Sequence, residues 1–243
     1  TYEYLELKPE NFKESLKNQL IDGFNITIPY KTKVMNYLDK INQRAIDINS
    51  VNCIKNINGK LIGFNTDWYG FSMLLKKNNI SIFGKSFLVL GAGGVAKSIV
   101  YVLLREGAKE VYIMNRTKIN ALNFIKEIKY EYSSKLKFIT SEEFKKTQNE
   151  KWSLINCTPV GMYPNMNESP FPKDMIGANN ILIDTIYNPI KTKFLDYGKN
   201  IIINGLDMFI FQALASLDIW FESDISNQVD FSELKELLGK NIC

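Results

Sequence analysis

The residues whose types and spacing most clearly indicate a chemical function form a glycine-rich segment, Gly91-Ala92-Gly93-Gly94-Val95, followed by Ala96. The segment fits the pattern G-x-G-x-x-G/A, with Ala96 at the third small position. The first glycine of such a segment makes a tight turn, and the second lets backbone N–H groups approach a pyrophosphate at a helix N-terminus. The segment predicts a dinucleotide site, with a plain glycine-rich connection as the alternative.

The residues that follow the next predicted strand indicate which dinucleotide binds. Sites for NAD usually place Asp or Glu about 20 residues beyond the glycines, where the carboxylate holds the ribose 2′-OH. This chain has Asn115-Arg116-Thr117 there and no acidic residue. Arg116 is one of three arginines in the chain, and a guanidinium pairs with a 2′-phosphate in a planar fork. We therefore expect NADP, with a solvated arginine at a strand end as the alternative.

A second group of polar residues lies within the first 70 residues. In the run Asn25-Ile26-Thr27-Ile28-Pro29-Tyr30-Lys31, alternation predicts a strand over 24–28 with Asn25 and Thr27 on one face. Because the face with the two isoleucines should be the buried one, Asn25 and Thr27 are expected to point into a crevice. Taken singly, Lys31 is typical of a solvated charge, Asn52 of a strand-end amide, and Asp67 of a helix cap.

Alternating strand and helix patterns predict an α/β fold, with a Rossmann-type, doubly wound parallel sheet between residues 84 and 205. Short apolar runs predict buried strands, and apolar residues near 3.6-residue spacing predict helices. The expected strands are 86–90, 111–114, 136–139, 153–156, 181–184 and 201–203, and the expected helices are 95–106 and 118–129.

The two ends of the chain predict a second lobe. The expected elements before residue 84 are a helix over 31–40, a hairpin of 50–54 and 60–64 turned at Asn58-Gly59, and a helix over 68–77 capped by Thr66 or Asp67. The helices expected at 206–221 and 231–238 should pack back on this lobe. The predicted domains are therefore 1–83 with 206–243, and 84–205, with a cleft between them.

Composition excludes several classes of protein. The chain contains no histidine, which rules out Ser-His-Asp and Cys-His catalysis and zinc held by histidine. Cys53, Cys157 and Cys243 are too far apart for a metal site or a disulfide framework, so we expect reduced cytoplasmic thiols and no metal. The net charge of +4 is spread along the chain, and no apolar run approaches the roughly 18 residues of a membrane span. We expect neither nucleic acid nor membrane as a partner.

Taken together, these segments resemble the motifs of the shikimate dehydrogenase family. Residues 25–31 resemble its N-V-T-x-P-x-K, 50–53 its A-V-N-T, and 63–67 its G-x-N-T-D. Residues 91–96 resemble its G-A-G-G-A, 115–117 its N-R-T, and 156–162 its N-A-T-P-x-G-M. Residues 184–187 are similar to its D-x-x-Y, and 205–212 to its G-x-x-M-L-x-x-Q. The motifs follow one another in family order along nearly the whole chain.

This resemblance implies the reversible, NADP-dependent reduction of 3-dehydroshikimate to shikimate, a step of aromatic amino-acid biosynthesis. It implies that Lys31 and Asp67 are the catalytic pair and that 1–83 with 206–243 bind the substrate, a small molecule. The implied substrate-binding residues are Thr27, Asn52, Asp67, Tyr187 and Gln212. The implied NADP-binding residues are Gly91, Ala92, Gly93, Gly94, Val95, Asn115, Arg116, Thr117, Thr158, Thr185 and Gly205.

The chain also departs from the family pattern. The family begins with a strand and an H-S-x-S-P loop that binds the substrate carboxylate, and no match precedes Thr1, so we expect a chain shorter by about one β-α unit. Cys53 replaces a threonine, Ser50 a small residue, and Trp68 a glycine, and the indole is expected to narrow the cleft or change substrate preference. Alternative functions are an NAD-using quinate/shikimate dehydrogenase and a catalytically impaired dinucleotide-binding protein. Monomer and homodimer both stay open.

Overall fold

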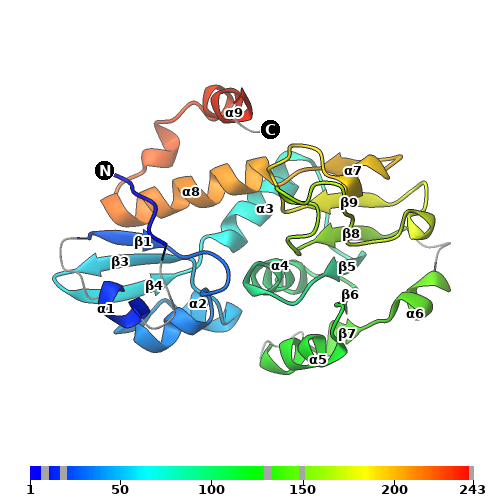
Figure 1. Ribbon diagram of the computed structural model, residues 1–243, viewed down its shortest axis with the longest axis horizontal. Coiled ribbons are helices and arrows are strands. Elements are labelled where there is room, and N and C mark those ends of the chain that lie inside the picture. The colour runs from blue at the N-terminus through cyan, green and yellow to red at the C-terminus, as the bar shows by residue number, and fades with distance from the viewer. Residues whose placement is uncertain (7–10, 17–20, 129–132, 148–150, 241–243) are drawn as a thin grey trace.

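The computed structural model describes residues 1–6, 11–16, 21–128, 133–147 and 151–240. Two β-sheets lie side by side, and the helices α3 (Asp67–Lys77) and α8 (Leu206–Phe221) run between them (Figure 1). We call the part built on the four-stranded sheet the small lobe and the part built on the six-stranded sheet the large lobe. This arrangement confirms the α/β fold with two lobes.

The large lobe is built on a parallel sheet in the order β10-β9-β8-β5-β6-β7. This order places the first and fourth strands of the sheet side by side at its centre, as in the doubly wound dinucleotide folds. Its strands are β5 (Ser86–Leu90), β6 (Glu110–Met114), β7 (Leu136–Phe138), β8 (Ser153–Asn156), β9 (Ile181–Asp184) and β10 (Ile202–Ile203). The six strands expected from the apolar runs are confirmed.

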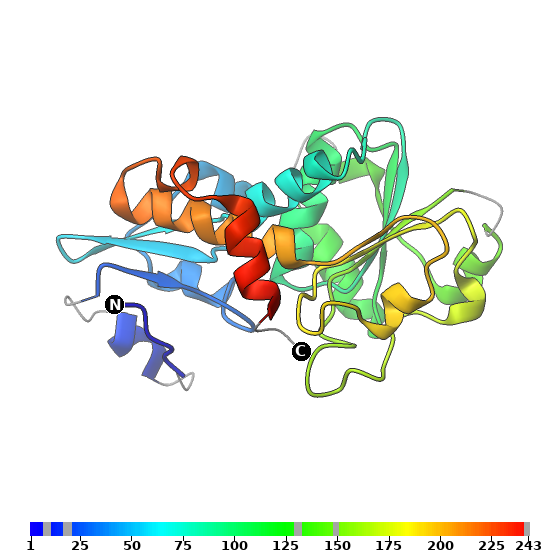
Figure 2. The same cartoon turned by 90° about the horizontal axis from the view of Figure 1, so that it is seen from above.

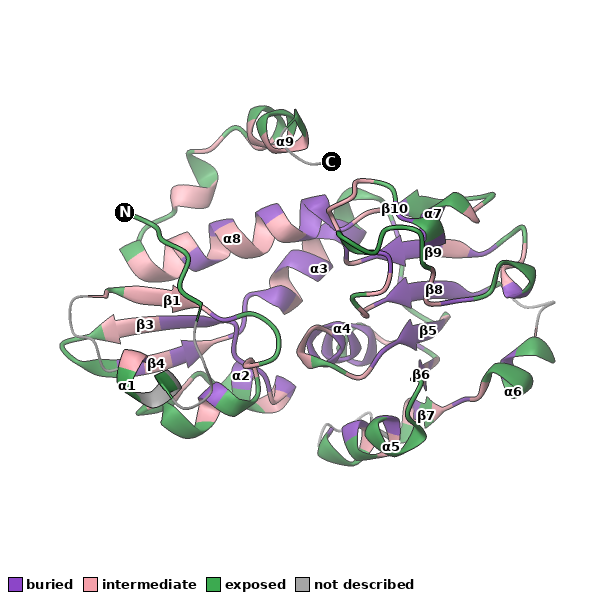
Figure 3. Cartoon of the chain, viewed as in Figure 1, coloured by how far each residue is buried: buried purple, intermediate pink, exposed green. Residues whose placement is uncertain are grey.

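Helices cover both faces of this sheet, which explains why its strands are apolar on both sides. Phe87 and Val89 of β5 pack with α3, α4 (Gly94–Arg105) and α5 (Lys118–Glu127) on one face. Leu88 and Leu90 pack on the other face with α6 (Ser141–Lys145) and α7 (Lys193–Asp196). The central strands are therefore buried between two layers (Figure 3). Short 3-10 turns, η3 (Ser133–Lys135) and η4 (Lys173–Met175), complete the lobe.

The small lobe is built on a mixed sheet in the order β1-β3-β4-β2. Its elements are α1 (Phe12–Leu16), β1 (Gly23–Asn25), η2 (Lys33–Tyr37), β2 (Lys40–Ile41), α2 (Gln43–Ile48), β3 (Cys53–Ile57) and β4 (Lys60–Phe64). The β3–β4 hairpin turns at Asn58 and Gly59, which both have positive φ, as the Asn-Gly pair predicts. Its β3 strand begins at Cys53, three residues later than expected.

The helices α3 and α8 pack closely because Gly70 has no side chain. A Cβ on Gly70 would lie 2.5 Å from the carbonyl oxygen of Met208 on α8. At the other end of α8, Trp220 lies against Gly23 and donates from Nε1 to the carbonyl of Ile54 at 2.8 Å. The predicted return of the C-terminal chain to the small lobe is thus confirmed for α8.

The last helix lies on the outside of the molecule. The 3-10 turn η5 (Ile225–Asn227) leads into α9 (Phe231–Lys240), which crosses over α8 (Figure 2). Phe231 of α9 stacks on Phe211 of α8, with ring centroids 4.4 Å apart. No residue of α9 is buried, so the packing joins one apolar face of α9 to α8. In the described part of the chain, no helix is long and apolar enough to cross a membrane.

Two local expectations, a strand and a helix of the small lobe, were wrong. The strand expected over 24–28 ends at Asn25, because a turn in which Tyr30 N–H bonds to the Thr27 carbonyl follows it. Ile28 is consequently 61% exposed and does not share the buried position of Ile26. The helix expected over 31–40 is reduced to η2, since Lys40 joins β2. By contrast, the helix expected over about 118–129 is confirmed as α5, which ends at Glu127, and Lys129 lies outside the described residues.

Candidate active site

An ion pair joins the two residues that the resemblance marks as catalytic. The Nζ atom of Lys31 lies 2.6 Å from Oδ2 of Asp67. The two side chains are 11% and 6% exposed, so water screens the pair less than it would at a surface. Lys31 follows the turn after β1, and Asp67 is the first residue of α3. A carboxylate in the first turn of a helix is also favoured by the helix dipole.

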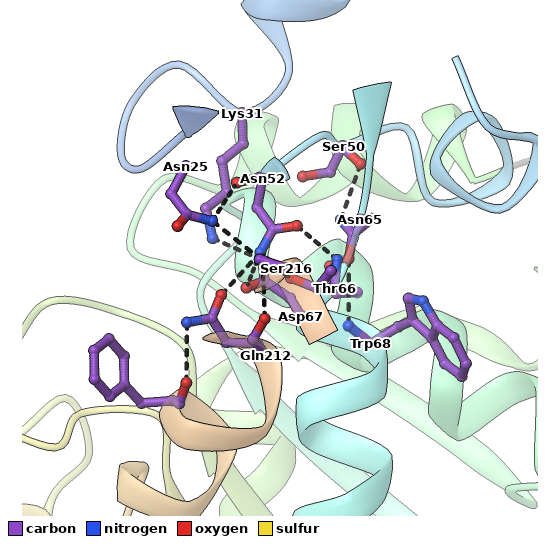
Figure 4. Close-up of polar contacts among 12 residues, drawn as sticks. Asn25, Lys31, Ser50, Asn52, Asn65, Thr66, Asp67, Trp68, Gln212 and Ser216 are labelled. Carbon is purple, nitrogen blue, oxygen red and sulfur yellow. Dashed lines mark hydrogen bonds and ion pairs between the residues drawn. The ribbon is translucent and has the colours of Figure 1, made fainter. Parts of the chain in front are cut away.

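Asn52 holds Asp67 and Gln212 in a fixed arrangement (Figure 4). Its Nδ2 atom lies 3.0 Å from Asp67 Oδ1, 2.9 Å from Thr66 Oγ1 and 3.2 Å from Gln212 Oε1. Its Oδ1 accepts from the Thr66 N–H at 2.6 Å, which determines which way the amide points. Asn52 is 2% exposed, and buried amides are normally bonded in this way. Three segments far apart in sequence therefore meet at one amide.

Two hydroxyl groups extend this network, and sequence reasoning missed one of them. Ser216 on α8 lies 3.1 Å from Thr66 Oγ1 and accepts from Asn25 Nδ2 at 3.2 Å. The signal was available, because Ser216 follows Gln212 by one helical turn on a mostly apolar helix. Asn25 thus points into the cluster as expected. Thr27, expected beside it, is exposed, because the strand has already ended.

The indole of Trp68 lies away from this cluster (Figure 4). It packs against the core of the large lobe and under the guanidinium of Arg44, which lies 4.0 Å from the ring centroid. The backbone N–H of Trp68 bonds to Asn65 Oδ1 at 3.3 Å, so Asn65 supplies the cap expected from Thr66 or Asp67. The expectation that Trp68 narrows the cleft was wrong, because the first turn of α3 directs adjacent side chains to different sides.

A groove of about 650 Å³ passes between the lobes beside Lys31. On the large-lobe side it is lined by the glycine-rich segment, Gly91 to Val95, together with Asn115, Cys157 and Thr158. Its position at the carboxyl ends of β5 and β8 is the switch point at which doubly wound sheets bind ligands. Lys31 lines the same groove, so the ion pair and the glycine-rich segment belong to one site.

Each glycine of this segment is there for a different structural reason. Gly91 has φ of 104°, and a Cβ there would lie 2.9 Å from Thr158 Cγ2. A Cβ on Gly93 would meet nothing within 4 Å, so the backbone before α4 is open to a large group. A Cβ on Gly94 would lie 3.0 Å from Lys31 Cβ. The N-terminus of α4, with its unpaired N–H groups, is therefore free to receive the pyrophosphate of a dinucleotide.

The expected 2′-phosphate residues lie at the end of β6. Asn115 lines the groove and donates from Nδ2 to the Thr117 carbonyl at 2.9 Å. Arg116 and Thr117 are exposed, and no carboxylate stands in this segment to repel a phosphate or to hold a 2′-OH. The hydrogen-bond donors of Asn115, Arg116 and Thr117 fit the 2′-phosphate of NADP. Arg116 and Thr117 themselves do not line the groove beside Gly91.

The remaining expected residues lie after β9, at Thr185 and Tyr187, and at the start of α8, at Gly205. Gly205 lies against Thr185, because a Cβ on Gly205 would be 2.2 Å from the Thr185 carbonyl oxygen. Tyr187 is half-buried and stacks on Phe209, with ring centroids 4.3 Å apart. Burial raises the pKa of its hydroxyl, with a smaller contribution from Tyr2. None of these three residues lines the groove beside Gly91, so the structure does not bring them into contact with the Lys31–Asp67 pair.

A buried carboxylate supports the Thr158 side of the groove. Asp184 accepts from Asn156 Nδ2 at 3.0 Å and from Thr192 Oγ1 at 2.6 Å. Asn156 Oδ1 in turn accepts from the backbone N–H and the hydroxyl of Thr158, at 2.9 and 2.8 Å. Burial raises the pKa of Asp184 to about 6, against the lowering effect of these hydrogen bonds. Asp184 thus fixes the orientation of the amide that holds Thr158.

The cysteines are poor candidates for chemistry. Burial raises the pKa of the Cys53 thiol to about 12. Burial, together with Asp184, raises the pKa of Cys157 well above its usual value. Cys243 lies outside the described residues. Among the residues described, no group of three or more His, Cys, Asp or Glu is arranged to hold a metal. Lys31 is a cationic group that lines this groove and is paired with a carboxylate, which makes it a candidate proton donor.

Known proteins resemble this chain over most of its length. The family models for the shikimate dehydrogenase substrate binding domain and for shikimate / quinate 5-dehydrogenase match residues 1–54 and 73–156. The curated shikimate dehydrogenase (NADP(+)) of Clostridium beijerinckii is 39% identical over 234 residues, which are 94% of this chain and 83% of that relative.

Solved structures share the fold as well. A chorismate mutase/shikimate 5-dehydrogenase fusion protein from Clostridium acetobutylicum gives a TM-score of 0.82 at 34% identity, over 98% of this chain and 86% of that chain. Shikimate 5-dehydrogenase from Listeria monocytogenes, solved in complex with shikimate and NAD, gives 0.81 at 29% identity, over 96% of this chain and 84% of that chain. The likeness therefore spans both lobes and the groove between them.

Proposed function

The chain belongs to the shikimate dehydrogenase family, and on that premise we propose that it reduces 3-dehydroshikimate to shikimate, reversibly and with NADPH. The curated relatives are NADP-dependent shikimate dehydrogenases, so the chain is assigned as an oxidoreductase of the same pathway. The observation that carries the proposal is the 2.6 Å pair of Lys31 and Asp67 beside the glycine-rich segment.

In this proposal one lobe binds the cofactor and the other binds the substrate. Residues 84–205 bind NADP, with the pyrophosphate at the N-terminus of α4 and the 2′-phosphate near Asn115, Arg116 and Thr117. Residues 1–83 and 206–243 bind the substrate, with Asn52 and Gln212 as hydrogen-bonding groups next to the catalytic pair. The family motifs further imply Thr27 and Tyr187 as substrate-binding residues. Thr158, Thr185 and Gly205 line the nicotinamide end of the site.

Lys31 acts as the proton donor for ketone reduction. When NADPH is bound, it supplies the hydride for the carbonyl carbon. Negative charge then develops on the carbonyl oxygen, and the Lys31 ammonium transfers a proton to that oxygen, which becomes the hydroxyl. Asp67 accepts a hydrogen bond from Nζ throughout, which keeps the donor oriented and balances its charge. In the direction of oxidation, the neutral amine accepts the proton from the hydroxyl.

A turnover assay tests the proposed function. Shikimate and NADP should produce NADPH absorbance at 340 nm, and the rate with NAD should be lower. A higher rate with NAD identifies the alternative, an NAD-using quinate/shikimate dehydrogenase. Cofactor binding without turnover of shikimate or quinate identifies the other, a catalytically impaired dinucleotide-binding protein.

The free cysteines indicate the cellular compartment in which the protein works. We infer that the protein works in the cytoplasm, where its free thiols at Cys53 and Cys157 stay reduced.

The groove lies within a single chain, so both a monomer and a homodimer are compatible with the reaction. Light scattering on the purified protein decides between these two states.

A further inference from the structure

Lys97 is a buried lysine for which the proposed reaction has no use. It lies in the first turn of α4, three residues after Gly94, and its side chain is 6% exposed. Lysines are rarely buried to this degree unless their charge is paired. Its Nζ atom lies 2.7 Å from Glu127 Oε2, 3.3 Å from Thr32 Oγ1 and 3.3 Å from the Asn49 carbonyl oxygen. All three ammonium donors therefore have partners.

These partners come from both lobes. Glu127 ends α5 in the large lobe, whereas Thr32 and Asn49 belong to the small lobe. Asn49 also donates from Nδ2 to the same Glu127 oxygen at 3.1 Å, and the Thr32 hydroxyl donates to the Asn49 carbonyl at 3.4 Å. Three side chains, together with the backbone carbonyl and the side chain of Asn49, form a closed ring of hydrogen bonds around one ammonium group. We call these four residues the Lys97 bridge.

The Lys97 bridge holds the chain directly next to Lys31. Thr32 is the next residue in sequence, and the Lys31 carbonyl accepts from the N–H of Val51, two residues after Asn49, at 2.8 Å. On the opposite side, the Lys31 side chain lies against Gly94 on the same helix end that carries Lys97. The catalytic lysine and the bridge thus share one contact between the lobes, at the N-terminus of α4.

We propose that Lys97 is a positioning residue for Lys31: it holds the small-lobe segment that carries the proton donor against the helix end that binds the cofactor. This inference rests on the proposed function for its catalytic consequence, but its structural consequence stands apart from turnover. Geometry favours a positioning role over direct contact with a cofactor phosphate. Lys97 lines the groove, yet its ammonium is buried and all of its donors are engaged by protein.

Steady-state kinetics separate positioning from cofactor contact. Lys97→Met keeps the length and apolar stem of the side chain and removes the ammonium. Because a displacement of about 1 Å at a reacting group can cost up to 10²-fold, we expect kcat to fall roughly 10- to 100-fold. KM for NADP should stay within about 2-fold, and Lys97→Arg should restore part of kcat. Lys60→Met, at the exposed end of β4, is the matched control and should change neither constant.

Amide hydrogen exchange tests the same idea without turnover. In Lys97→Met, exchange at the N–H of Val51 should be faster by roughly 10-fold, because its acceptor segment is released, while Val89 in β5 keeps its protection. Glu127→Gln is the second variant in case Lys97→Met unfolds. It weakens the same bridge without leaving a lysine unpaired, and it should change Val51 exchange in the same direction by less.

The outcomes are distinct. A rise in KM for NADP with kcat and Val51 exchange unchanged overturns the proposal in favour of direct phosphate contact. Unchanged kinetics and unchanged exchange in both variants also overturn it. If the wild-type protein shows no shikimate turnover, the proposed function fails. Faster Val51 exchange in the variants would then still support Lys97 as the residue that holds the Lys31 segment.

Discussion

Lys31 lies against Gly94, so the proton donor of the small lobe contacts the helix end of the large lobe directly. A Cβ placed on Gly94 would lie 3.0 Å from Lys31 Cβ and 3.2 Å from Lys31 Cδ. This contact explains why position 94, directly after Gly93, is also a glycine. Gly93 leaves room for the cofactor, whereas Gly94 leaves room for Lys31 to pass between α4 and Asp67.

Gly94→Ala should therefore lower activity without unfolding the protein. The added methyl pushes the Lys31 stem by a few tenths of an ångström, and we expect kcat to fall by about 10-fold. Alanine favours helix over glycine by up to about 1 kcal/mol, which offsets part of the crowding. Gly239→Ala in α9 is the matched control, since nothing lies within 4 Å of its added Cβ. Steady-state rates and thermal melts of both variants make the comparison, and equal kcat in both would contradict the contact.

Replacing Lys31 tests the proton donor itself. Lys31→Ala should lower kcat by roughly 10²- to 10⁴-fold and raise KM for shikimate far less, because the lost proton transfer belongs to the transition state. Steady-state kinetics in the direction of oxidation give both constants. Asp67 stays buried without its partner in this variant, so a thermal melt must show that the protein is folded. Lys60→Ala is the control, and an unchanged kcat in Lys31→Ala would remove Lys31 from the chemistry.

Arg116 tests the choice between NADP and NAD. Arg116→Ala should lower kcat/KM with NADP by roughly 10- to 100-fold, which corresponds to the loss of a charged hydrogen bond to the 2′-phosphate. The much lower kcat/KM with NAD should hardly change, because NAD has no phosphate there. Arg105→Ala, at the C-terminal end of α4, is the control. An equal loss with both cofactors would show that Arg116 supports the fold of the segment and does not read the phosphate.

The large lobe could be predicted well because its signals are local. Each strand is a short apolar run, and the glycines around Gly91 mark a strand-to-helix turn in which Gly91 has a positive φ. The family motifs also predicted that Lys31, Asn52, Asp67 and Gln212 belong to one site. The structure places their side chains in contact, although Gln212 on α8 is far in sequence from the other three.

The failures have a common physical cause, which is tertiary structure overriding a local pattern. The alternation through Ile28 continues in sequence but not in space, because a turn begins at Thr27. The direction of the Trp68 indole depends on the start of α3 and on Arg44, which comes from another helix. The Lys97 bridge joins four residues whose types are ordinary for a surface, so the sequence carries no signal of it.

The pH dependence of stability tests the buried carboxylate that holds the Thr158 loop. Burial raises the pKa of Asp184 to about 6, whereas a free aspartate titrates near pH 3.9. Between these two values the folded chain keeps a proton that the unfolded chain has released. The contribution of Asp184 to stability therefore falls as pH rises through this window, and the cost is complete at about pH 7.

Asp184→Asn removes this titration while keeping an acceptor for Asn156 and a donor for the Thr192 hydroxyl. We expect the free energy of unfolding of the variant, relative to wild type, to rise by roughly 2 kcal/mol between pH 4 and pH 7. Urea titrations at several pH values measure the difference. Asp22→Asn, at an exposed carboxylate, is the control variant in the same titrations. A flat difference for Asp184→Asn would mean that Asp184 titrates normally, and that its buried charge is stabilised fully by Asn156, Thr192 and the Ile186 N–H.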